Sequence, residues 1–415
     1  MDRRTFLRLT AASGLAATAP WPARRALAAD PYPGPYWLFF HASGGWDPTL
    51  LCDPKGRRNE QEVDPVNTYF TDEIEEVGPF KVPPVDGMRA FFSRFRDQLL
   101  VINGVDTQTN SHETGTRHTW SGSMDPGMPA LGALLGTHVE PRPSLSYLAH
   151  GGYDVTDGLV APTRLADTSA ILEIAYPERL DPSKEESTFL PDSLMARLAQ
   201  ARNDRLQRLH DGATLPRVAR SRELLALSRS GDNELARLAT RLPSSLPNDG
   251  LQRQAQVSLA CFEAGVAVAA SLSTGGFDTH GNHDASHTPR LQTLVNGITY
   301  AMDEAERRGI ADKVIVVVGS DFARTPYYND GNGKDHWSIT SMMMMGPGIR
   351  GGRVVGATDE RQVPLRLDPE TLQLRDGGVR ITPADVHASL RQLAGMDAWD
   401  VAARYPVGSL LPLLG

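Results

Sequence analysis

The sequence predicts an α/β fold, namely a doubly wound, mainly parallel sheet with helices on both faces and a helical insertion. Three observations predict it. Apolar runs typical of buried strands alternate with segments whose apolar residues have helical spacing. The chain has 415 residues, which suits one large α/β domain or two smaller ones. A hydrophobic content of 40% and a charged content of 22% allow a large packed core.

The predicted strands are continuous apolar runs, as expected where both faces of a sheet are covered by helices. They are residues 36–42, 99–105, 266–273, 313–320 and 339–346. The last run contains four consecutive methionines, which we expect to fill the core rather than to bind a soft metal.

Helices are predicted between these runs. Apolar residues three and four apart indicate helices within residues 86–98, 128–139 and 251–264. Pro289 is expected to open a further amphipathic helix, with Thr288 as its cap, and Thr382 to cap a last helix that runs to about residue 393. Residues 153–247 are charged, helical and Pro-rich in pattern, and we interpret them as a helical insertion or lid.

The first 28 residues predict an export signal. Arg3 and Arg4, followed by "TFL", resemble the twin-arginine motif, and an apolar stretch and an A-x-A cleavage pattern at 26–28 follow. An amphipathic helix of the mature fold is the alternative, but residues 9–19 lack helical periodicity. We therefore expect a signal peptide at 1–28, a linker at 29–35 and the domain at 36–415. The expected location is periplasmic or secreted, reached through the twin-arginine translocation machinery.

Composition excludes several classes of function. A net charge of −8 argues against nucleic acid as a partner, because phosphate binding needs a basic surface. No run of 18 apolar residues is present, so no integral membrane span is expected. The two cysteines are too few for a zinc knuckle or an iron–sulfur cluster, and Cys261 lies in an apolar run that predicts a buried free thiol.

Acids and histidines follow the predicted strands. In a parallel sheet, ligands bind beyond the carboxyl ends of the strands, so these scattered residues are expected to form one site. Carboxylates and imidazoles together suit a divalent Zn, Mn, Ca or Mg ion. Asp278 and His280 in "GFDTHGNHDASH" are the predicted ligands of that segment, whereas His283, Asp284 and His287 are expected to support ligands or to lie in a loop. The other residues of this predicted site are Asp47, Ser111, His112, Asp321, Asp335 and His336.

An ordered set of motifs gives this pattern a family context. "GGWD", "NSHETG", "GGFDTHGNH", "SDFARTPYYNDGNGKDHW" and "GPGIRGG", behind the export signal, resemble the secreted bacterial proteins called domain of unknown function 1501. That family is related to the alkaline phosphatase and sulfatase superfamily. The resemblance spans most of residues 36–395 apart from the helical middle. It implies an alkaline-phosphatase-like core, one or two metal ions beside a Ser or Thr nucleophile, and hydrolysis of phosphate or sulfate esters.

The resemblance also implies roles for particular residues. Its metal ligands would be Asp47, Asp278, His280, Asp321 and His336. The superfamily has a His directly after the acid that Asp321 matches, whereas this chain has Phe322, so one metal ion is expected and a second is in doubt. Arg324 is expected either to pair with an oxyanion or to form a salt bridge with a neighbouring acid.

Ser111 is the predicted nucleophile, since it precedes His112 at the start of a predicted helix, where the helix dipole favours an anion. Serine is also a common helix cap, and Thr107 and Thr109 are rival nucleophiles. The sulfatase signature C-x-P-S-R is absent, because "CDPKG" at Cys52 lacks its Ser and Arg, which argues against a formylglycine enzyme.

Two classes of function therefore remain. The first is an exported metal-dependent hydrolase of phosphate or sulfate esters, acting on a small-molecule or glycan substrate, in which the metal polarises the ester and Ser111 or a metal-bound hydroxide attacks. The alternative is a non-catalytic exported binding protein of the same fold, with a structural metal or none.

Overall fold

The computed structural model describes residues 30–165 and 245–415 without a gap, and between them residues 169–176, 178–181, 184, 186–212, 215 and 234–243. The predicted signal peptide at 1–28 lies outside the described residues. The chain divides into two compact units, of which one contains Tyr32–Ala166 and Arg241–Gly415 and the other contains Asp167–Thr240. They are described separately.

The larger unit is built on a seven-stranded sheet in the order β11-β4-β10-β7-β1-β6-β5. All neighbouring strands run parallel except at β10, which is antiparallel to both β4 and β7. The predicted α/β class with a mainly parallel sheet is confirmed. The strands are β1 (Tyr36–Ala42), β4 (Leu100–Asp106), β5 (Tyr147–Ala149), β6 (Ala269–Thr274), β7 (Val314–Ser320), β10 (Ile339–Met345) and β11 (Arg353–Val355).

The central strands are buried along their whole length, as their continuous apolar sequences predict. The four methionines of β10 are at most 1% exposed and belong to the core. Two short ribbons complete the strands of this unit. They are β2 (Glu75–Val77) with β3 (Phe80–Val82), and β8 (Ala323–Arg324) with β9 (His336–Trp337).

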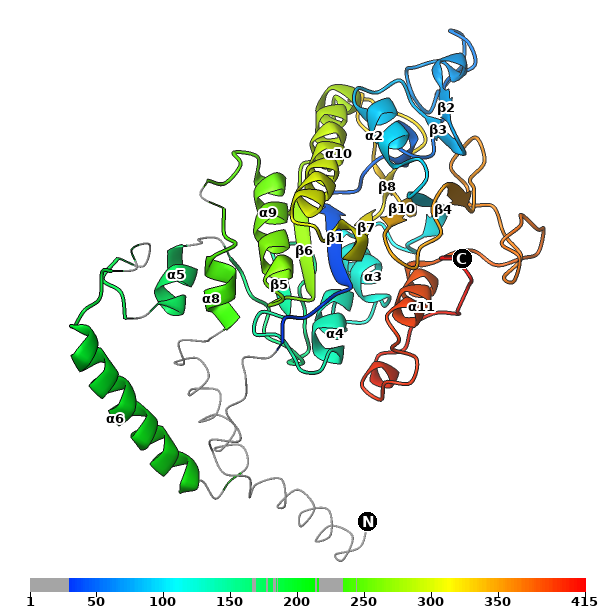
Figure 1. Ribbon diagram of the computed structural model, residues 1–415. Helices are drawn as coiled ribbons and strands as arrows, with labels where there is room; N and C mark the ends of the chain where they lie inside the picture. Colours follow the sequence, from blue (N-terminus) through cyan, green and yellow to red (C-terminus); the bar gives the residue numbers. More distant parts are fainter. Residues whose placement is uncertain are drawn as a thin grey trace, which may run out of the picture. The chain divides into compact units, whose positions relative to one another are not determined.

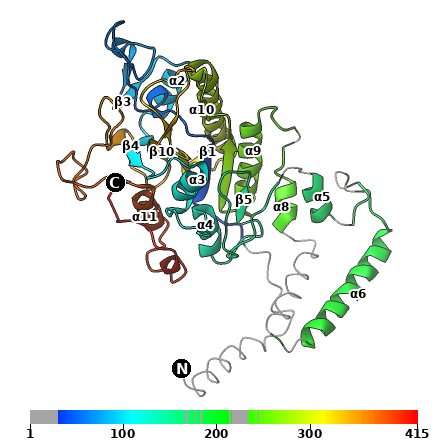
Figure 2. The same cartoon turned by 180° about the vertical axis from the view of Figure 1, so that it is seen from behind.

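Helices cover both faces of the sheet (Figures 1 and 2). One layer contains α2 (Met88–Phe95), α9 (Gly250–Glu263) and α10 (His283–Arg307). The other contains α3 (His112–Ser121), α4 (Leu131–His138) and α11 (Pro383–Leu393). The predicted cap of α11 is confirmed, because the Thr382 side chain accepts a hydrogen bond from the Asp385 N–H in a capping box.

The start of α10 differs from the sequence prediction. The helix begins at His283, not at Pro289, and Pro289 lies inside it. The early turns are fixed by tertiary contacts, since the His283 N–H donates to the carbonyl of Asn332 and both His283 and His287 are fully buried. Thr288 does not cap the helix, because its hydroxyl donates to the carbonyl of Asp284 within it. Tertiary packing here overrides the boundary that proline suggests.

The smaller unit contributes the helices α5 (Ser169–Ala175), α6 (Asp192–Asp211) and α8 (Glu234–Ala239). They lie within residues 153–247, and the assignment of that whole segment as an insertion stays a prediction. No helix in the described part of the chain has the length and apolarity required to cross a bilayer.

Both cysteines are buried free thiols, as predicted for Cys261. Burial raises the pKa of Cys261 to about 12, so this thiol stays protonated and unreactive.

A buried histidine in α11 makes stability depend on pH. His387 is 1% exposed and its Nε2 atom lies 2.8 Å from the carbonyl oxygen of Thr119, and burial lowers its pKa from 6.5 to about 3. Below pH 6.5 the unfolded chain takes up a proton that the folded chain refuses, so stability falls as the pH falls. We expect this group to cost about 2 kcal/mol of unfolding free energy between pH 6.5 and 5.

The check is urea unfolding of the wild-type protein and His387→Gln at a series of pH values, with chelator present throughout. The glutamine amide can still donate to the Thr119 carbonyl but does not titrate. The variant should lose less stability than the wild type on acidification, and parallel curves would contradict the prediction.

Candidate metal centre

The predicted site residues gather at one edge of the sheet. Asp47, Asp278 and Asp321 follow the carboxyl ends of β1, β6 and β7, and Ser111 and His112 follow β4, which runs in the same direction. The β8–β9 ribbon places Arg324 beside His336. The rule for parallel sheets therefore locates these groups correctly, and the structure sorts them into an open cluster and a buried one.

The open cluster is centred on the carboxylate of Asp278. Its Oδ1 atom lies 3.0 Å from the Nε2 atom of His280, 3.2 Å from that of His336 and 3.4 Å from that of His112. The donor atoms of His112, Asp278 and His336 all lie within 4.8 Å of one another. His280 adjoins this triad, with its Nε2 atom 3.1 Å from that of His336. One small cation could contact all of these atoms.

The other ring nitrogen of each histidine has an oxygen partner. The Nδ1 atom of His112 lies 2.5 Å from Asp321 Oδ2, that of His280 lies 2.6 Å from Asp335 Oδ1, and that of His336 lies 2.8 Å from the Asn110 carbonyl. With a proton on each Nδ1 atom, each Nε2 atom presents its lone pair to Asp278. Histidines that bind metals are oriented in this way by carboxylates and carbonyls.

One atom of the cluster shows directly that a partner is needed. The Nε2 atom of His112 is buried and makes no hydrogen bond to any residue of the described ranges. A lone pair that faces a carboxylate across 3.4 Å is unfavourable unless a cation or a proton lies between them. The donor set of imidazoles and one carboxylate fits a divalent ion such as zinc.

The charges of the cluster also favour a cation. Asp278, Asp321 and Asp335 carry three negative charges against one positive charge on Arg324, if the imidazoles are neutral. Burial opposes ionisation of Asp278, but the hydrogen bond from Arg324 lowers its pKa. Asp321 is also buried, and the bond from His112 lowers its pKa to about 2. The carboxylates therefore stay ionised at neutral pH.

Close backbone packing fixes these positions. Helix α3 approaches the end of β7 so closely that a Cβ atom on Gly115 would lie 2.3 Å from the Asp321 carbonyl oxygen. Gly45 has φ +79°, and a Cβ atom there would lie 2.6 Å from the ring of Phe322. Gly115 is required for the close approach of α3, which carries His112, to Asp321, and Gly45 for the close packing of its turn against Phe322.

The sequence profile of the family described as "Protein of unknown function (DUF1501)" matches residues 37–405. The chain belongs to the DUF1501 family. The family resemblance that the ordered motifs predict is thus confirmed. No functionally curated protein is detectably similar to this chain in sequence.

Three solved structures are among those similar to this DUF1501 protein. The alkaline phosphatase of the Antarctic bacterium TAB5 is 10% identical, with a TM-score of 0.31, over 76% of this chain and 92% of that one. The phosphonate monoester hydrolase of Agrobacterium radiobacter is 11% identical, with a TM-score of 0.35, over 87% and 74%. The lipoteichoic acid synthase of Listeria monocytogenes is 7% identical, with a TM-score of 0.38, over 90% and 75%.

Asp47 belongs to the buried cluster of this DUF1501 protein. It is fully buried, and within the described residues its hydrogen bonds and ion pairs go to Thr49, His283, His287 and Lys334 rather than to the open cluster. Its Oδ2 atom accepts hydrogen bonds from Lys334 at 2.6 Å and from His283 at 3.0 Å, and its Oδ1 atom accepts two from Thr49. The structure thus separates this sequence-predicted ligand from Asp278, His280 and His336.

Arg324 and Asp321 each contact a residue of the open cluster, namely Asp278 and His112. The guanidinium of Arg324 is buried and donates to Asp278 and to the carbonyls of Gly44, Gly45 and Lys334. The contact with Asp278 is a salt bridge, which is one of the two roles expected for Arg324. Asp321 accepts from Gly44 N–H, Gly45 N–H and Ser320 Oγ, in addition to its contact with His112. Both residues hold the Gly44–Gly45 turn, which follows β1, in place.

Ser111 is the exposed N-cap residue of α3, directly before His112. Within the described residues its hydroxyl makes no capping hydrogen bond to the helix. The rival hydroxyls are engaged, since Thr107 donates to the carbonyls of Thr109 and Ser338, and Thr109 accepts from the Ser111 N–H. Of the three, the Ser111 hydroxyl is the best placed to meet a ligand.

Sequence reasoning placed His112 in the site but not among the ligands, and it missed Lys334. The Ser-His pair at a helix start was the available signal for His112. For Lys334 the sequence carries no comparable signal, because its partner Asp47 is 287 residues away. The spacing of four between His283 and His287 was a usable sign that both rings share one helix face.

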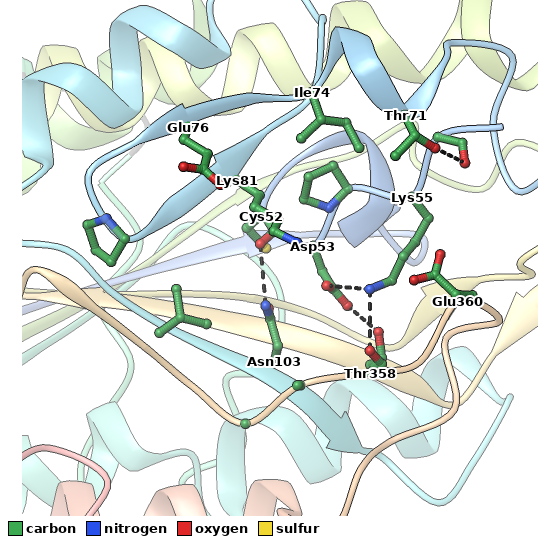
Figure 3. Close-up of a pocket in the computed structure, with 16 residues that line it drawn as sticks. Cys52, Asp53, Lys55, Thr71, Ile74, Glu76, Lys81, Asn103, Thr358 and Glu360 are labelled. Atoms are coloured by element: carbon green, nitrogen blue, oxygen red, sulfur yellow. Dashed lines mark hydrogen bonds and ion pairs between the residues drawn. The ribbon is translucent and has the colours of Figure 1, made fainter. Parts of the chain in front are cut away.

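A separate cavity of about 430 Å³ lies between the segment after η3 (Pro48–Leu50) and the end of β11 (Figure 3). Asp53 and Lys55 form an ion pair of 2.9 Å in its wall, and Thr358 donates to Asp53. None of the predicted site residues lines this cavity.

Proposed function

We propose that this protein is a metal-dependent hydrolase of phosphate or sulfate esters that acts in the periplasm or outside the cell. One observation carries the proposal. The imidazole nitrogens of three histidines converge on the Asp278 carboxylate, each ring is oriented by an oxygen on its far side, and Ser111 directly precedes one of these histidines at the start of α3. Export by the twin-arginine route is part of the proposal and rests on residues 1–28.

The proposed ligands are His112, Asp278 and His336, with His280 as a fourth group on the exposed side. When bound there, a divalent ion would polarise a phosphoryl or sulfuryl oxygen. Asp321 and Asp335 contact the Nδ1 atoms of His112 and His280, which orients both rings with their Nε2 atoms toward Asp278. Arg324 holds Asp278 ionised and in place.

Ser111 is the proposed nucleophile. It stands at the N-terminus of a ten-residue helix, where unpaired backbone N–H groups and the helix dipole attract the anionic oxygens of an ester. Its neighbour His112 belongs to the proposed ligand set, and the proposal places the hydroxyl beside the reacting group. These two features would orient the ester and lower the pKa of the attacking hydroxyl.

The test measures metal content and ester hydrolysis together. Protein folded in the cytoplasm and loaded with Zn²⁺ or Mn²⁺ should bind the ion and turn over aryl phosphate or aryl sulfate esters. Ser111→Ala should keep the metal and lose turnover by about 10³-fold or more. Ser123→Ala, two residues beyond the far end of the same helix, is the matched control and should behave as wild type.

A second function, binding without catalysis, is favoured by the cavity of Figure 3, which is large enough for a small ligand and lies apart from the metal centre. If the protein binds metal but turns over no ester, and if Ser111→Ala leaves the metal content unchanged, the result would support binding over hydrolysis. Protein that binds no divalent ion would refute the metal centre itself.

A further inference from the structure

We propose that the ammonium group of Lys334 takes the place of a second metal ion at Asp47, so that the protein holds one divalent ion per chain. The inference rests on the metal centre of the proposed function and extends it to the buried cluster. That cluster consists of Asp47, Thr49, Asn67, Thr279, His283, His287 and Lys334.

Lys334 occupies a cation position made of oxygen atoms. Its Nζ atom lies 2.6 Å from Asp47 Oδ2, 2.9 Å from Asn67 Oδ1 and 3.5 Å from Thr49 Oγ1, and the side chain is fully buried. The ring of Tyr328 lies 5.1 Å away and adds a cation–π contact. A carboxylate, an amide oxygen and a hydroxyl are the oxygen donors that a hard metal ion would take. Here the side chain of the protein itself supplies the positive charge.

Asp47 has no lone pair left for a metal ion. Two hydrogen bonds from Thr49 reach Oδ1, at 2.9 Å from its N–H and 2.6 Å from its hydroxyl. The Oδ2 atom accepts from Lys334 and from the Nε2 atom of His283. A metal ion could bind Asp47 only by displacing a fully buried ammonium group.

The ring nitrogens of the two buried histidines, His283 and His287, are also engaged in hydrogen bonds. The Nε2 atom of His287 accepts from the Asp47 N–H, so the proton of His287 is on Nδ1 and points to Thr279 Oγ1 at 3.0 Å. The Thr279 hydroxyl in turn donates to the Nδ1 atom of His283 at 2.7 Å, which leaves the proton of His283 on Nε2, facing Asp47. With both rings neutral, every donor in this series of hydrogen bonds meets an acceptor. The His287 lone pair is taken by the Asp47 N–H, so neither ring offers a free lone pair beside the Asp47 carboxylate.

The carboxylate of Asp321, the other acid expected at a second ion, is also occupied by hydrogen bonds. It accepts from two backbone N–H groups and from Ser320, and it contacts His112. The next residue is Phe322, whose ring packs 4.5 Å from that of His336 and 4.6 Å from that of His112. An aromatic residue thus stands at the sequence position where the resembled superfamily has a His ligand, and a second divalent ion lacks that donor as well as a free carboxylate.

The experiment counts metal ions per chain by elemental analysis after loading with excess Zn²⁺ or Mn²⁺ and gel filtration. The wild type should hold one ion. The double variant Asp47→Asn/Lys334→Met removes both buried charges at similar volume and should still hold one, whereas His336→Ala should hold none. The metal-induced rise in Tm should also be equal in the wild type and the double variant.

Two ions in the wild type and one in the double variant would overturn the inference and leave the open metal centre intact. No ion in the wild type would overturn the metal centre of the proposed function and the one-ion count with it. The wild-type count decides between these outcomes even if the double variant does not fold.

Discussion

Replacing Asp278 by asparagine should weaken zinc binding by about 100-fold or more, the largest effect that we expect at the open cluster. The Oδ1 atom of Asp278 is the point on which the Nε2 atoms of His112, His280 and His336 converge. Asparagine keeps the size of the side chain but removes the charge that a divalent ion needs. Changes to groups that only orient ligands cost 10- to 100-fold, so the loss of a direct ligand should exceed that range.

The measurement is a competition titration with a chromophoric chelator, and Asp330→Asn is the matched control. Asp330 is an exposed acid of the loop that leads to His336. His336→Ala should lower affinity as much as Asp278→Asn does, and Asp335→Asn should cost less because it only orients His280. Unchanged zinc affinity in Asp278→Asn, with the variant folded, would contradict the assignment of the centre.

The sequence predicted five of the seven strands of the sheet, because these five are continuous apolar runs, which are typical of buried strands. It did not predict the short strands β5 and β11. It placed β1 at residues 36–42, as the structure does, and β7 and β10 within one residue at each end. It did not predict that β10 runs antiparallel to its neighbours, because an apolar run carries no information on strand direction. It misplaced the start of α10, because the contacts that stabilise the first turns of that helix come from distant segments.

The site shows the same limit. The sequence placed Asp278, His280 and His336 with Ser111 and His112 at one edge of the sheet, and the side chains of His112, Asp278, His280 and His336 do meet. The rule for carboxyl ends does not say which way a side chain turns. Asp47 turns to Lys334 and His283 rather than to Asp278, and this choice depends on a lysine that only the folded chain brings near. Arg324 likewise contacts Asp278 across 46 residues of sequence.

The Gly44–Gly45 turn accounts for how two polar clusters coexist beyond the end of β1. Its N–H groups bind Asp321 and its carbonyls bind Arg324, so the turn ties together the two residues that orient the open cluster. The chain then enters the buried cluster at Trp46 and Asp47, whose side chains are fully buried. The open cluster keeps lone pairs directed at a common point, whereas the buried cluster satisfies its lone pairs with hydrogen bonds between its own members.

Lys334→Met should destabilise the metal-free protein by about 3–5 kcal/mol, the largest stability effect that we expect in the chain. The substitution removes the ammonium group from a fully buried ion pair of 2.6 Å and leaves the Asp47 carboxylate without its main partner. Burial raises the pKa of Asp47, but Lys334, together with the hydrogen bond from His283, holds it well below its usual range, so the carboxylate is ionised in the folded protein. An unpaired buried charge is far more costly than the loss of the pair as a whole.

A double-mutant cycle separates that pairing from simple packing. Asp47→Asn and Lys334→Met should each be costly, and the double variant should lose much less than the two losses added together, because no charge is left buried alone. Urea unfolding with chelator present supplies the free energies. Arg58→Ala, which breaks an exposed ion pair with Glu62, is the control and should change the unfolding free energy by no more than about 1 kcal/mol. Additive losses in the cycle would mean that Lys334 fills space without neutralising Asp47, and the one-ion inference would then lose its electrostatic basis.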